Sequence, residues 1–432
     1  MPNNTIENPQ EFPTSGFESI EPDRPVEEEE LPDYKADRFY PVRLGEVFND
    51  RYQTIAKLGF GSSSTTWLAR DLRAREYVAL KVYVHTSLVH RELPAYHQIS
   101  SRFSGSSHKG RGNVRRVLDS FEVDGPDGTH IVLVFEAAQM SLRDLKAVFF
   151  PDGFDEEFVK GAIEELLKAV DFLHTQGEIV HTGWYSTPQV LLLNTDNVIF
   201  LALKLFGLFS DFFYSDIHPG NMLLGAYKNS IFRAIQEAEY TNPVHRKQVS
   251  STRTIYLSRM MRPKEGPMLL SDFGEARIGP GPHAGDIMPL EYRAPETLLY
   301  VGWSYPIDIW SVGLTAWDLL GSKLLFTARD EDGDLYDAAH LAQLIAALGP
   351  PPPEFLAKNP ERRADFWDDQ GNWLGLAPIP DGRTMEALDS RSKDKAEFLK
   401  FLRRALTWMP EERATAKELL EDPWLRGKPR QR

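Results

Sequence analysis

The chain has 432 residues, 42% of them hydrophobic and 26% charged, which suits a soluble protein built as one two-lobed enzyme or as about two or three domains. A formal net charge of −14 argues against nucleic acid as a direct partner, because phosphate binding requires a basic face, and it would suit a basic protein substrate. The chain has no cysteine, which excludes disulfides, thiolate metal sites and cysteine nucleophiles.

Residues 1–38 are rich in Pro, Asn, Ser and Glu and contain the acidic run Glu27–Glu30. Such a composition buries too little apolar surface to offset the entropy of ordering, so we predict a disordered acidic tail. The start of the chain lacks an apolar run. We therefore expect no secretory signal and no membrane partner, and a location in the cytoplasm and nucleus.

Strand-like segments dominate the region after the tail, residues 39–139, which we expect to form a β-rich N-terminal lobe. Apolar and polar residues alternate there, and the first segment ends in glycine. The segments are Tyr52–Gly59, Thr66–Ala69, Tyr77–Val84 and His130–Phe135.

A helical pattern at Glu157–His174 belongs to the helix-rich remainder, residues 140–426. Its apolar residues recur at helical spacing on one face. They are Val159, Ile163, Leu166, Leu167 and Val170. After Pro295 the sequence is mostly helical, with breaks rich in Pro and Gly. Strands first and helices afterwards predict an α+β fold with a β-rich lobe and an α-rich lobe.

A glycine-containing stretch between the first two strands is the first candidate site. Glycine lets the backbone approach a phosphate closely with its N–H groups directed at it, although an ordinary hairpin turn would look similar. Ser64 stands where a third glycine would complete the pattern. The candidate nucleotide-binding residues here are Leu58, Gly59, Phe60, Gly61, Ser62, Ser63, Ser64, Thr65 and Thr66.

Lys81 lies within an apolar strand, Val78–Val82. A lysine in such a strand is costly unless its ammonium meets an anion, and the alternative is a lysine that points to solvent from an edge strand. Glu92 is the candidate partner, although it could be a solvated charge on a helix.

Asp272 follows an apolar strand and is itself followed by Phe273 and Gly274. A carboxylate at that position can supply a hard oxygen ligand for Mg²⁺ beside the phosphates, whereas the tripeptide alone is equally typical of an ordinary turn. The segments Tyr292–Glu296 and Asp308–Gly313 come after it in the chain, and this ordered series is far more specific than any single member.

Together these motifs resemble a eukaryotic protein kinase over about residues 51–425. Within that superfamily the chain resembles the SR-protein kinases, especially their short fungal relatives. The stretches behind this resemblance are Ser64–Asp71, the pair His181 and Thr182, Asp272–Arg277, Trp303–Trp310, and Thr252–Arg259, which is similar to the shortened spacer of that group.

The resemblance implies a two-lobed protein-kinase fold and a serine/threonine kinase that uses ATP and Mg²⁺. Lys81 would bridge the α- and β-phosphates and pair with Glu92. A spacer would occupy residues 225–268. The substrates would be basic Arg/Ser-rich proteins involved in RNA processing, and we expect a monomer. Further nucleotide contacts would come from Ala79, Glu136 and Ala138.

The same resemblance assigns structural roles to residues outside the nucleotide site. Glu296 is expected to pair with Arg413, and Asp308 is expected to brace the catalytic loop. The stretch Thr327–Lys393 fits the insert that is characteristic of the wider group of kinases.

The catalytic loop is split in the sequence. His181 and Thr182 begin the family's pattern, which resumes only at Asp216 and continues to Asn221. When the halves are joined, Asp216 would accept the proton of the substrate hydroxyl and Asn221 would hold magnesium. His218 stands where most serine/threonine kinases have lysine, and a neutral histidine would stabilise the transferred phosphate less well.

Residues 183–215 separate the two halves and are rich in Leu, Phe and Val. A transmembrane helix is disfavoured, because the best apolar run, Val198–Phe213, is shorter than about 20 residues and contains Lys204 and Asp211. A lineage-specific insertion and a retained intron translated in frame remain, and we favour the intron because removing the segment restores the motif. Either would expose apolar side chains near the catalytic base.

These features leave two functions open. The first is a serine/threonine kinase, and the second is a catalytically impaired kinase fold, or the inactive product of a retained intron, that serves as a binding scaffold. Residues 275–293 contain no Ser or Thr, and Thr182 replaces the arginine that would bind an activating phosphate. We therefore hypothesise that activity needs no phosphorylation of this segment.

Overall fold

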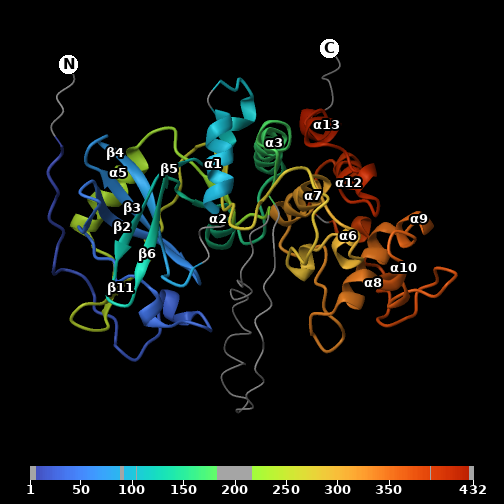
Figure 1. Cartoon of the computed structure of the whole chain (residues 1–432), viewed down its shortest axis with the longest axis horizontal. Helices are drawn as coiled ribbons and strands as arrows, with labels where there is room; N and C mark the ends of the chain where they lie inside the picture. Colours follow the sequence, from blue (N-terminus) through green and yellow to red (C-terminus); the bar gives the residue numbers. More distant parts are fainter. Residues whose placement is uncertain (1–5, 88–91, 104, 182–216, 390, 428–432) are drawn as a thin grey trace. The chain divides into compact units, whose positions relative to one another are not determined.

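The computed structural model describes residues 6–87, 92–103, 105–181, 217–389 and 391–427, which fall into two compact units (Figure 1). The first, called here the sheet unit, comprises Met1–Phe149 and Met222–Ser271. The second, the helical unit, comprises Phe150–Asn221 and Asp272–Arg432. The predicted boundary after residue 139 therefore differs from the structure, and the spacer at 225–268 belongs with the strands.

A six-stranded antiparallel sheet forms the centre of the sheet unit, in the order β1-β2-β3-β4-β6-β5. All four strand-like segments of the sequence analysis lie in this sheet, whereas the edge strand β5 was not foreseen. The strands are β1 Val47–Phe48, β2 Tyr52–Gly61, β3 Ser64–Asp71, β4 Glu76–Tyr83, β5 Val117–Asp124 and β6 Thr129–Glu136.

Each face of this sheet carries its own buried core, because successive side chains on a strand point to opposite faces. Trp67, Leu80 and Val134 lie on one face, together with Tyr256 from β11 (Thr254–Tyr256). Leu68 belongs to the core of the opposite face. Thr66 pairs with Lys81, and Leu68 pairs with Ala79, so these four side chains share that face.

The spacer folds onto this sheet. Helix α5 (Ser230–Thr241) buries Ile231, Phe232 and Ile235 against Leu68. The hairpin β10 (Arg246–Gln248) and β11 instead places Tyr256 on Trp67, with ring centroids 5.8 Å apart. Both sheet faces therefore gain part of their cover from the spacer, which explains why it belongs to the sheet unit.

Residues 6–38 are folded, in contrast to the predicted disordered tail. The helical turns η1 (Glu27–Glu30) and η2 (Ala36–Arg38) form within them, and Glu28 is 6% exposed. Phe12 stacks on Tyr240 of α5 with ring centroids 4.9 Å apart. The prediction of disorder from composition was wrong, because the acidic run pairs with basic residues far away in the sequence. We call residues 6–38 the N-terminal arm.

Further elements complete the sheet unit. A three-stranded sheet in the order β12-β9-β7 joins Met268–Leu270, Met222–Leu224 and Met140–Ser141. The other elements are the helices α1 (Glu92–Phe103) and α2 (Leu142–Phe149) and the 3₁₀ turn η4 (Lys109–Asn113). Tyr96 of α1 packs on Phe135 of β6 with ring centroids 5.3 Å apart.

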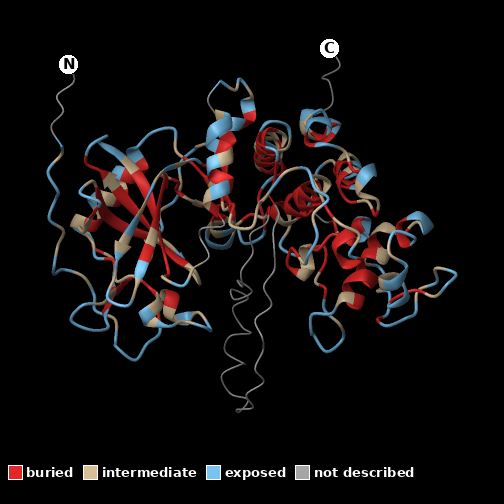
Figure 2. Cartoon of the chain, viewed as in Figure 1, coloured by how far each residue is buried: buried red, intermediate tan, exposed pale blue. Residues whose placement is uncertain are grey.

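The helical unit is built around α3 (Glu156–Phe172) and α7 (Pro306–Leu320), both largely buried (Figure 2). The predicted apolar face of α3 is confirmed, since all five of its residues are fully buried. A π-helical turn, η5 (Leu173–Gly177), and strand β8 (Ile179–Val180) follow α3, and β8 pairs with β13 (Arg277–Ile278).

Short helices complete the helical unit, as predicted for the sequence after Pro295. They are η6 Leu290–Tyr292, α6 Pro295–Leu298, α8 Asp337–Leu348, α9 Pro353–Leu356, α10 Pro360–Ala364, α11 Met385–Leu388, α12 Lys395–Ala405, η7 Pro410–Glu412, α13 Ala416–Leu419 and α14 Pro423–Arg426.

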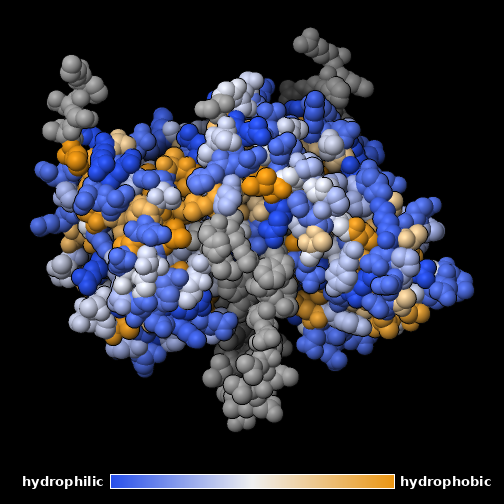
Figure 3. Space-filling model, viewed as in Figure 1, coloured by the Kyte–Doolittle hydropathy of each residue, from blue (hydrophilic) through white to orange (hydrophobic). Residues whose placement is uncertain are grey.

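Within the described ranges, no helix has the length and apolar character needed to cross a membrane. The visible face of each unit is mainly hydrophilic, with smaller apolar areas (Figure 3). The insertion at 183–215, together with Thr182 and Asp216, lies outside the described residues.

Candidate active site

Lys81 lies in β4 on the sheet face that also carries Thr66 and Ala79. Its Nζ is 3.6 Å from Glu92 Oε2, and the two side chains are 18% and 3% exposed. Glu92 begins α1 and also accepts a hydrogen bond from the Tyr83 hydroxyl. The predicted pair is therefore present, and a lysine that points to solvent is excluded. The buried carboxylate offsets the cost of placing an ammonium in the sheet.

The glycine-containing stretch is the turn between β2 and β3. Gly61 lies opposite Ser64, so Ser62 and Ser63 form the turn itself. Gly59 lies opposite Thr66, which in turn lies opposite Lys81. The hairpin backbone and the lysine are therefore on neighbouring strands, an arrangement that would let one polyphosphate contact both. Leu58 packs partly buried against the core that contains Leu68.

Glu136 ends β6, and both of its polar groups are engaged by arginines. Its carbonyl accepts hydrogen bonds from Arg115 Nε and one terminal nitrogen of Arg115, at 3.1 and 3.0 Å. Its carboxylate accepts from Arg116 Nε at 2.7 Å. Both polar groups of Glu136 therefore already bond to protein side chains. Ala138 follows in the connecting segment and is 6% exposed.

Asp272 occupies a turn with an unusual backbone. Its φ of 64° lies in the left-handed region, which few residues other than glycine adopt. Its carboxylate accepts the Gly274 N–H at 3.3 Å, and Phe273 is fully buried with its ring 4.7 Å from that of His181. Strain at such a turn is retained where the surrounding structure fixes it, often at functional sites. Here the buried Phe273 fixes the turn that presents Asp272.

Asn221 ends the resumed half of the catalytic loop and is 8% exposed. Its N–H donates to the His218 carbonyl at 3.0 Å, and the Gly220 N–H donates to His218 Nδ1 at 2.9 Å. His218 therefore caps its own turn with its ring nitrogen. The predicted base Asp216 lies outside the described residues.

Asp308 braces this loop as predicted. Its Oδ2 accepts the His181 N–H at 2.9 Å and is 2.8 Å from His174 Nε2. Burial alone would raise the pKa of Asp308, but the hydrogen bond and charge of His174, together with His181, outweigh burial and hold this pKa below its usual value. Thr315 Oγ1 donates to the Ile217 carbonyl at 3.1 Å and so ties the other half of the loop to α7.

The predicted pair of Glu296 and Arg413 is confirmed. Both terminal nitrogens of Arg413 donate to the Glu296 carboxylate at 2.6 Å, and the side chains are 1% exposed or less. A two-point arginine–carboxylate contact of this kind fixes orientation as well as charge. It ties α6 to the segment after η7 in the helical unit.

Comparisons with known proteins agree with these motifs. The family model described as "Protein kinase domain" matches residues 253–425. A serine/threonine protein kinase from Aspergillus fumigatus is 38% identical over 418 residues, which cover 95% of this chain and 94% of that protein. The chain belongs to the protein kinase family.

Other relatives narrow the kinase further. The serine/threonine-protein kinase SRPK of Physarum polycephalum is 31% identical, over 93% of this kinase and 92% of the relative. The human SRSF protein kinase 3 is 24% identical, over 92% of this kinase and 90% of the relative. A solved kinase domain with 20% identity superposes with a TM-score of 0.64, covering 90% of this chain and 99% of that one. The kinase is thus a serine/threonine kinase of SR-kinase-like type, and the predicted two-lobed fold class is confirmed.

Arg115 is the residue of this kinase that sequence reasoning missed. It is buried, its guanidinium carbon lies 4.7 Å from the Phe135 ring centroid, and one terminal nitrogen is 3.5 Å from Ser271 Oγ. Burial lowers the pKa of Arg115. Through its hydrogen bonds, Arg115 connects the end of β6 with Ser271, the residue before Asp272. No local pattern marks this arginine, because its partners lie far away in the sequence.

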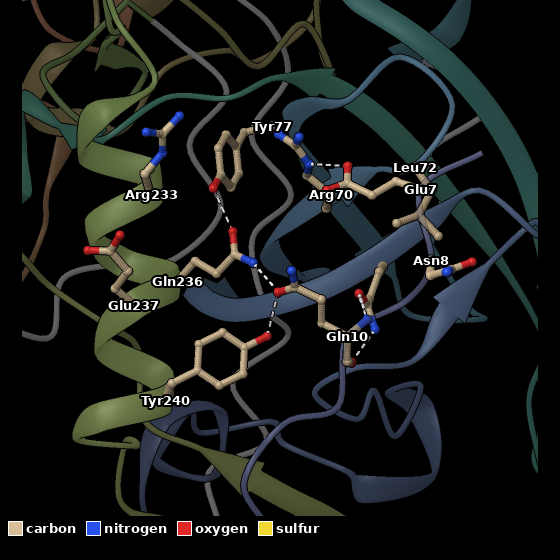
Figure 4. Close-up of a pocket in the computed structure, with 11 residues that line it drawn as sticks. Glu7, Asn8, Gln10, Arg70, Leu72, Tyr77, Arg233, Gln236, Glu237 and Tyr240 are labelled. Atoms are coloured by element: carbon tan, nitrogen blue, oxygen red, sulfur yellow. Dashed lines mark hydrogen bonds and ion pairs between the residues drawn. The ribbon is translucent and has the colours of Figure 1, made fainter. Parts of the chain in front are cut away.

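The kinase also contains a separate polar cavity of about 340 Å³ in the sheet unit (Figure 4). None of the predicted nucleotide residues lines it. Tyr77 donates to Gln236, which donates to Gln10, and Tyr240 also donates to Gln10 (Figure 4). These partners satisfy one another, and Arg70 is paired with Glu7.

Proposed function

We propose that this kinase transfers the γ-phosphate of ATP to serine in basic, Arg/Ser-rich proteins of RNA processing. The observation that carries the proposal is the ion pair between Lys81 and Glu92, which holds an ammonium beside the glycine hairpin. A lysine fixed in this way is the residue that kinases use to orient the ATP phosphates.

The remaining residues take roles that their chemistry supports. The Asp272 carboxylate and the Asn221 amide offer hard oxygen ligands, which suit Mg²⁺, and we propose that they hold it. Bound magnesium would neutralise charge on the phosphates. Asp216 would accept the proton of the substrate hydroxyl. The hairpin residues Gly59 and Gly61 would direct backbone N–H groups at the phosphates.

Two features support the substrate class. Relatives carry the names SRPK and SRSF protein kinase, and they align over almost the whole chain. The net charge of −14 favours a basic substrate, and exposed carboxylates gather before α8 at Glu331, Asp332 and Asp334. We extend the proposal to a monomer in the cytoplasm and nucleus, which light scattering and imaging of the tagged kinase would test.

The proposal is tested by transfer of labelled phosphate to three peptides that contain Arg/Ser, Lys/Ser or Arg/Ala repeats. The full chain and a variant that joins Thr182 to Asp216 are assayed in parallel with magnesium and ATP. We expect the Arg/Ser peptide to be phosphorylated at least about tenfold faster than the Lys/Ser peptide, because arginine binds carboxylates at two points. Equal rates for both would overturn the substrate class.

A scaffold without transferase activity is the second candidate, and the separation of His181 from Asp216 in sequence favours it. Small misplacement of the base can slow proton transfer about 100-fold. Nucleotide binding without phosphate transfer, in both the full and the joined chain, would support the scaffold. Transfer by the joined chain alone would identify residues 183–215 as the cause, and sequencing the transcript across codons 182–216 would show whether they are a retained intron.

A further inference from the structure

Ser258 fastens the N-terminal arm to the spacer. It lies two residues after β11 and is partly exposed. Its N–H donates to Glu27 Oε1 at 2.9 Å, and its hydroxyl donates to Glu27 Oε2 at 2.6 Å. One serine therefore satisfies both oxygens of the first residue of η1. These hydrogen bonds link segments 231 residues apart in the chain.

Lys57 of β2 joins the same cluster. Its ammonium is 3.2 Å from Glu27 Oε2 and forms an ion pair with Glu28, while its side chain is 1% exposed. Arg259, next to Ser258, donates its N–H to the Lys57 carbonyl at 2.8 Å. Lys57 immediately precedes Leu58, where the nucleotide hairpin begins. The cluster of Glu27, Glu28, Lys57 and Ser258, called here the arm lock, therefore adjoins that hairpin.

Ser258 is followed directly by Arg259, whose side chain pairs with Glu239 at 2.6 Å, and four residues later by the exposed Arg262. A serine next to arginine is the type of acceptor that the proposed function of this kinase requires, and the assignment of the modifying enzyme rests on that function. We propose that Ser258 is a phosphorylation site, and that its phosphate opens the arm lock and releases the N-terminal arm.

The chemistry of the step is phosphoryl transfer from ATP. A bond forms between Ser258 Oγ and the γ-phosphorus, the bond from that phosphorus to the β–γ bridging oxygen breaks, and ADP leaves. The hydroxyl proton passes to the base of the modifying kinase. The modified Oγ no longer donates to Glu27, and a charge of about −1.5 to −2 arises beside a carboxylate. The phosphate also competes with Glu27 and Glu28 for the Lys57 ammonium.

Hydrogen exchange of the full chain tests the release directly. Phosphoserine is installed at position 258 by genetic encoding, so the test needs no kinase activity. We expect the amides of Leu31 and Glu29, which are bonded within η1, to exchange at least about tenfold faster than in the unmodified chain. Phosphoserine at the exposed Ser251, which is followed by Thr252 rather than directly by an arginine, is the matched control and should leave them unchanged.

One further variant separates the causes. Ser258→Ala removes the hydroxyl but keeps the backbone N–H and the Lys57 pair, so it should speed exchange less than the phosphate does. Exchange in phosphorylated chain equal to that in unmodified chain would overturn the release. Exchange equal to that of Ser258→Ala would overturn the role of charge.

A separate measurement tests which enzyme modifies Ser258. The Lys81→Ala chain is incubated as substrate with magnesium, ATP and a joined chain that carries Ser258→Ala, so any phosphate that mass spectrometry maps to Ser258 lies on the substrate. We expect phosphate at Ser258, and none there in a Lys81→Ala, Ser258→Ala chain. Transfer to an Arg/Ser peptide without transfer to Ser258 would overturn the site alone. Absence of transfer to both would overturn the proposed function, and the exchange measurement would still decide whether the arm lock responds to phosphate.

Discussion

At the scale of single residues, the buried arginine beside the nucleotide residues has the clearest consequence. Arg115 contacts the Glu136 carbonyl through two nitrogens and reaches Ser271 with a third. Lysine cannot reproduce this planar set of donors. We therefore infer that Arg115 is a positioning residue, which fixes the Glu136 carbonyl and Ser271 relative to each other.

We predict that Arg115→Lys lowers kcat/KM of the joined chain for ATP by at least about tenfold, because charged hydrogen bonds contribute about 1.5–3 kcal/mol each. The control is Arg111→Lys at an exposed position, which should change kcat/KM for ATP by less than about twofold. Steady-state kinetics with an Arg/Ser peptide measure both. A rise of KM for ATP with unchanged peptide KM would identify positioning of the nucleotide, whereas equal kinetics in both variants would contradict the role.

His340 gives a prediction about pH. It is fully buried in α8, and its Nε2–H donates to the Arg293 carbonyl at 2.8 Å. Burial lowers the pKa of His340 to about 4. Between about pH 4 and 6.5 the unfolded chain therefore binds one more proton than the folded chain, so stability falls as the pH falls through this range.

The expected loss is about 3 kcal/mol between pH 6.5 and pH 4. In the variant His340→Gln, whose side chain cannot titrate but can still donate, this part of the acid dependence should disappear. Urea unfolding at a series of pH values measures it. The same acid slope in wild type and variant would show that His340 does not cause the loss.

At the scale of elements, the N-terminal arm shows how a buried charge can order a polar segment. Lys57 is buried in β2 with Glu27 and Glu28 as its partners. Removing both carboxylates leaves a buried ammonium unpaired, which costs about 3–5 kcal/mol, whereas replacing all three charged side chains with uncharged ones of similar size costs much less.

We therefore predict that the double variant Glu27→Gln, Glu28→Gln is less stable than the triple variant Lys57→Met, Glu27→Gln, Glu28→Gln by at least about 2 kcal/mol. Thermal and urea unfolding followed by circular dichroism measure the difference. If the triple variant proves the less stable of the two, loss of the carboxylates does not leave a costly unpaired ammonium, and this explanation of how the arm is ordered would be wrong.

The segment at 275–293 supports another prediction at this scale. It contains no serine or threonine, so activity should not depend on phosphate there. Treating the joined chain with a broad phosphatase should change its rate less than about twofold. A large loss that returns after incubation with ATP would show that a phosphate elsewhere, or on Tyr292, controls activity.

Elements whose pattern lies within a few residues of sequence were predicted, whereas a segment held by partners far away in the sequence was not. Strands β2, β3, β4 and β6 and helix α3 carry their apolar periodicity within a few residues, and all were predicted. The N-terminal arm was not, because Glu28 and Glu29 find Lys57 and Lys247 only after folding. The edge strand β5 does alternate, with Phe121 and Val123 on one face, so a closer count could have found it.

The residues of the site likewise divide into those that local motifs predict and those that they do not. The pair of Lys81 and Glu92 and the pair of Glu296 and Arg413 were expected from motif spacing, because family patterns encode those contacts. Arg115 and Ser258 belong to no such pattern. Their importance follows only from which distant segments fold together.

At the scale of the whole molecule, the central claim is that a fixed lysine serves phosphate transfer in this kinase. The most direct measurement compares Lys81→Ala with Lys109→Ala, an exposed lysine of the same unit, in the joined chain. We predict that kcat/KM for an Arg/Ser peptide falls at least about 100-fold in Lys81→Ala and stays within about twofold in Lys109→Ala. Equal transfer by the two variants, with both folded, would contradict the claim.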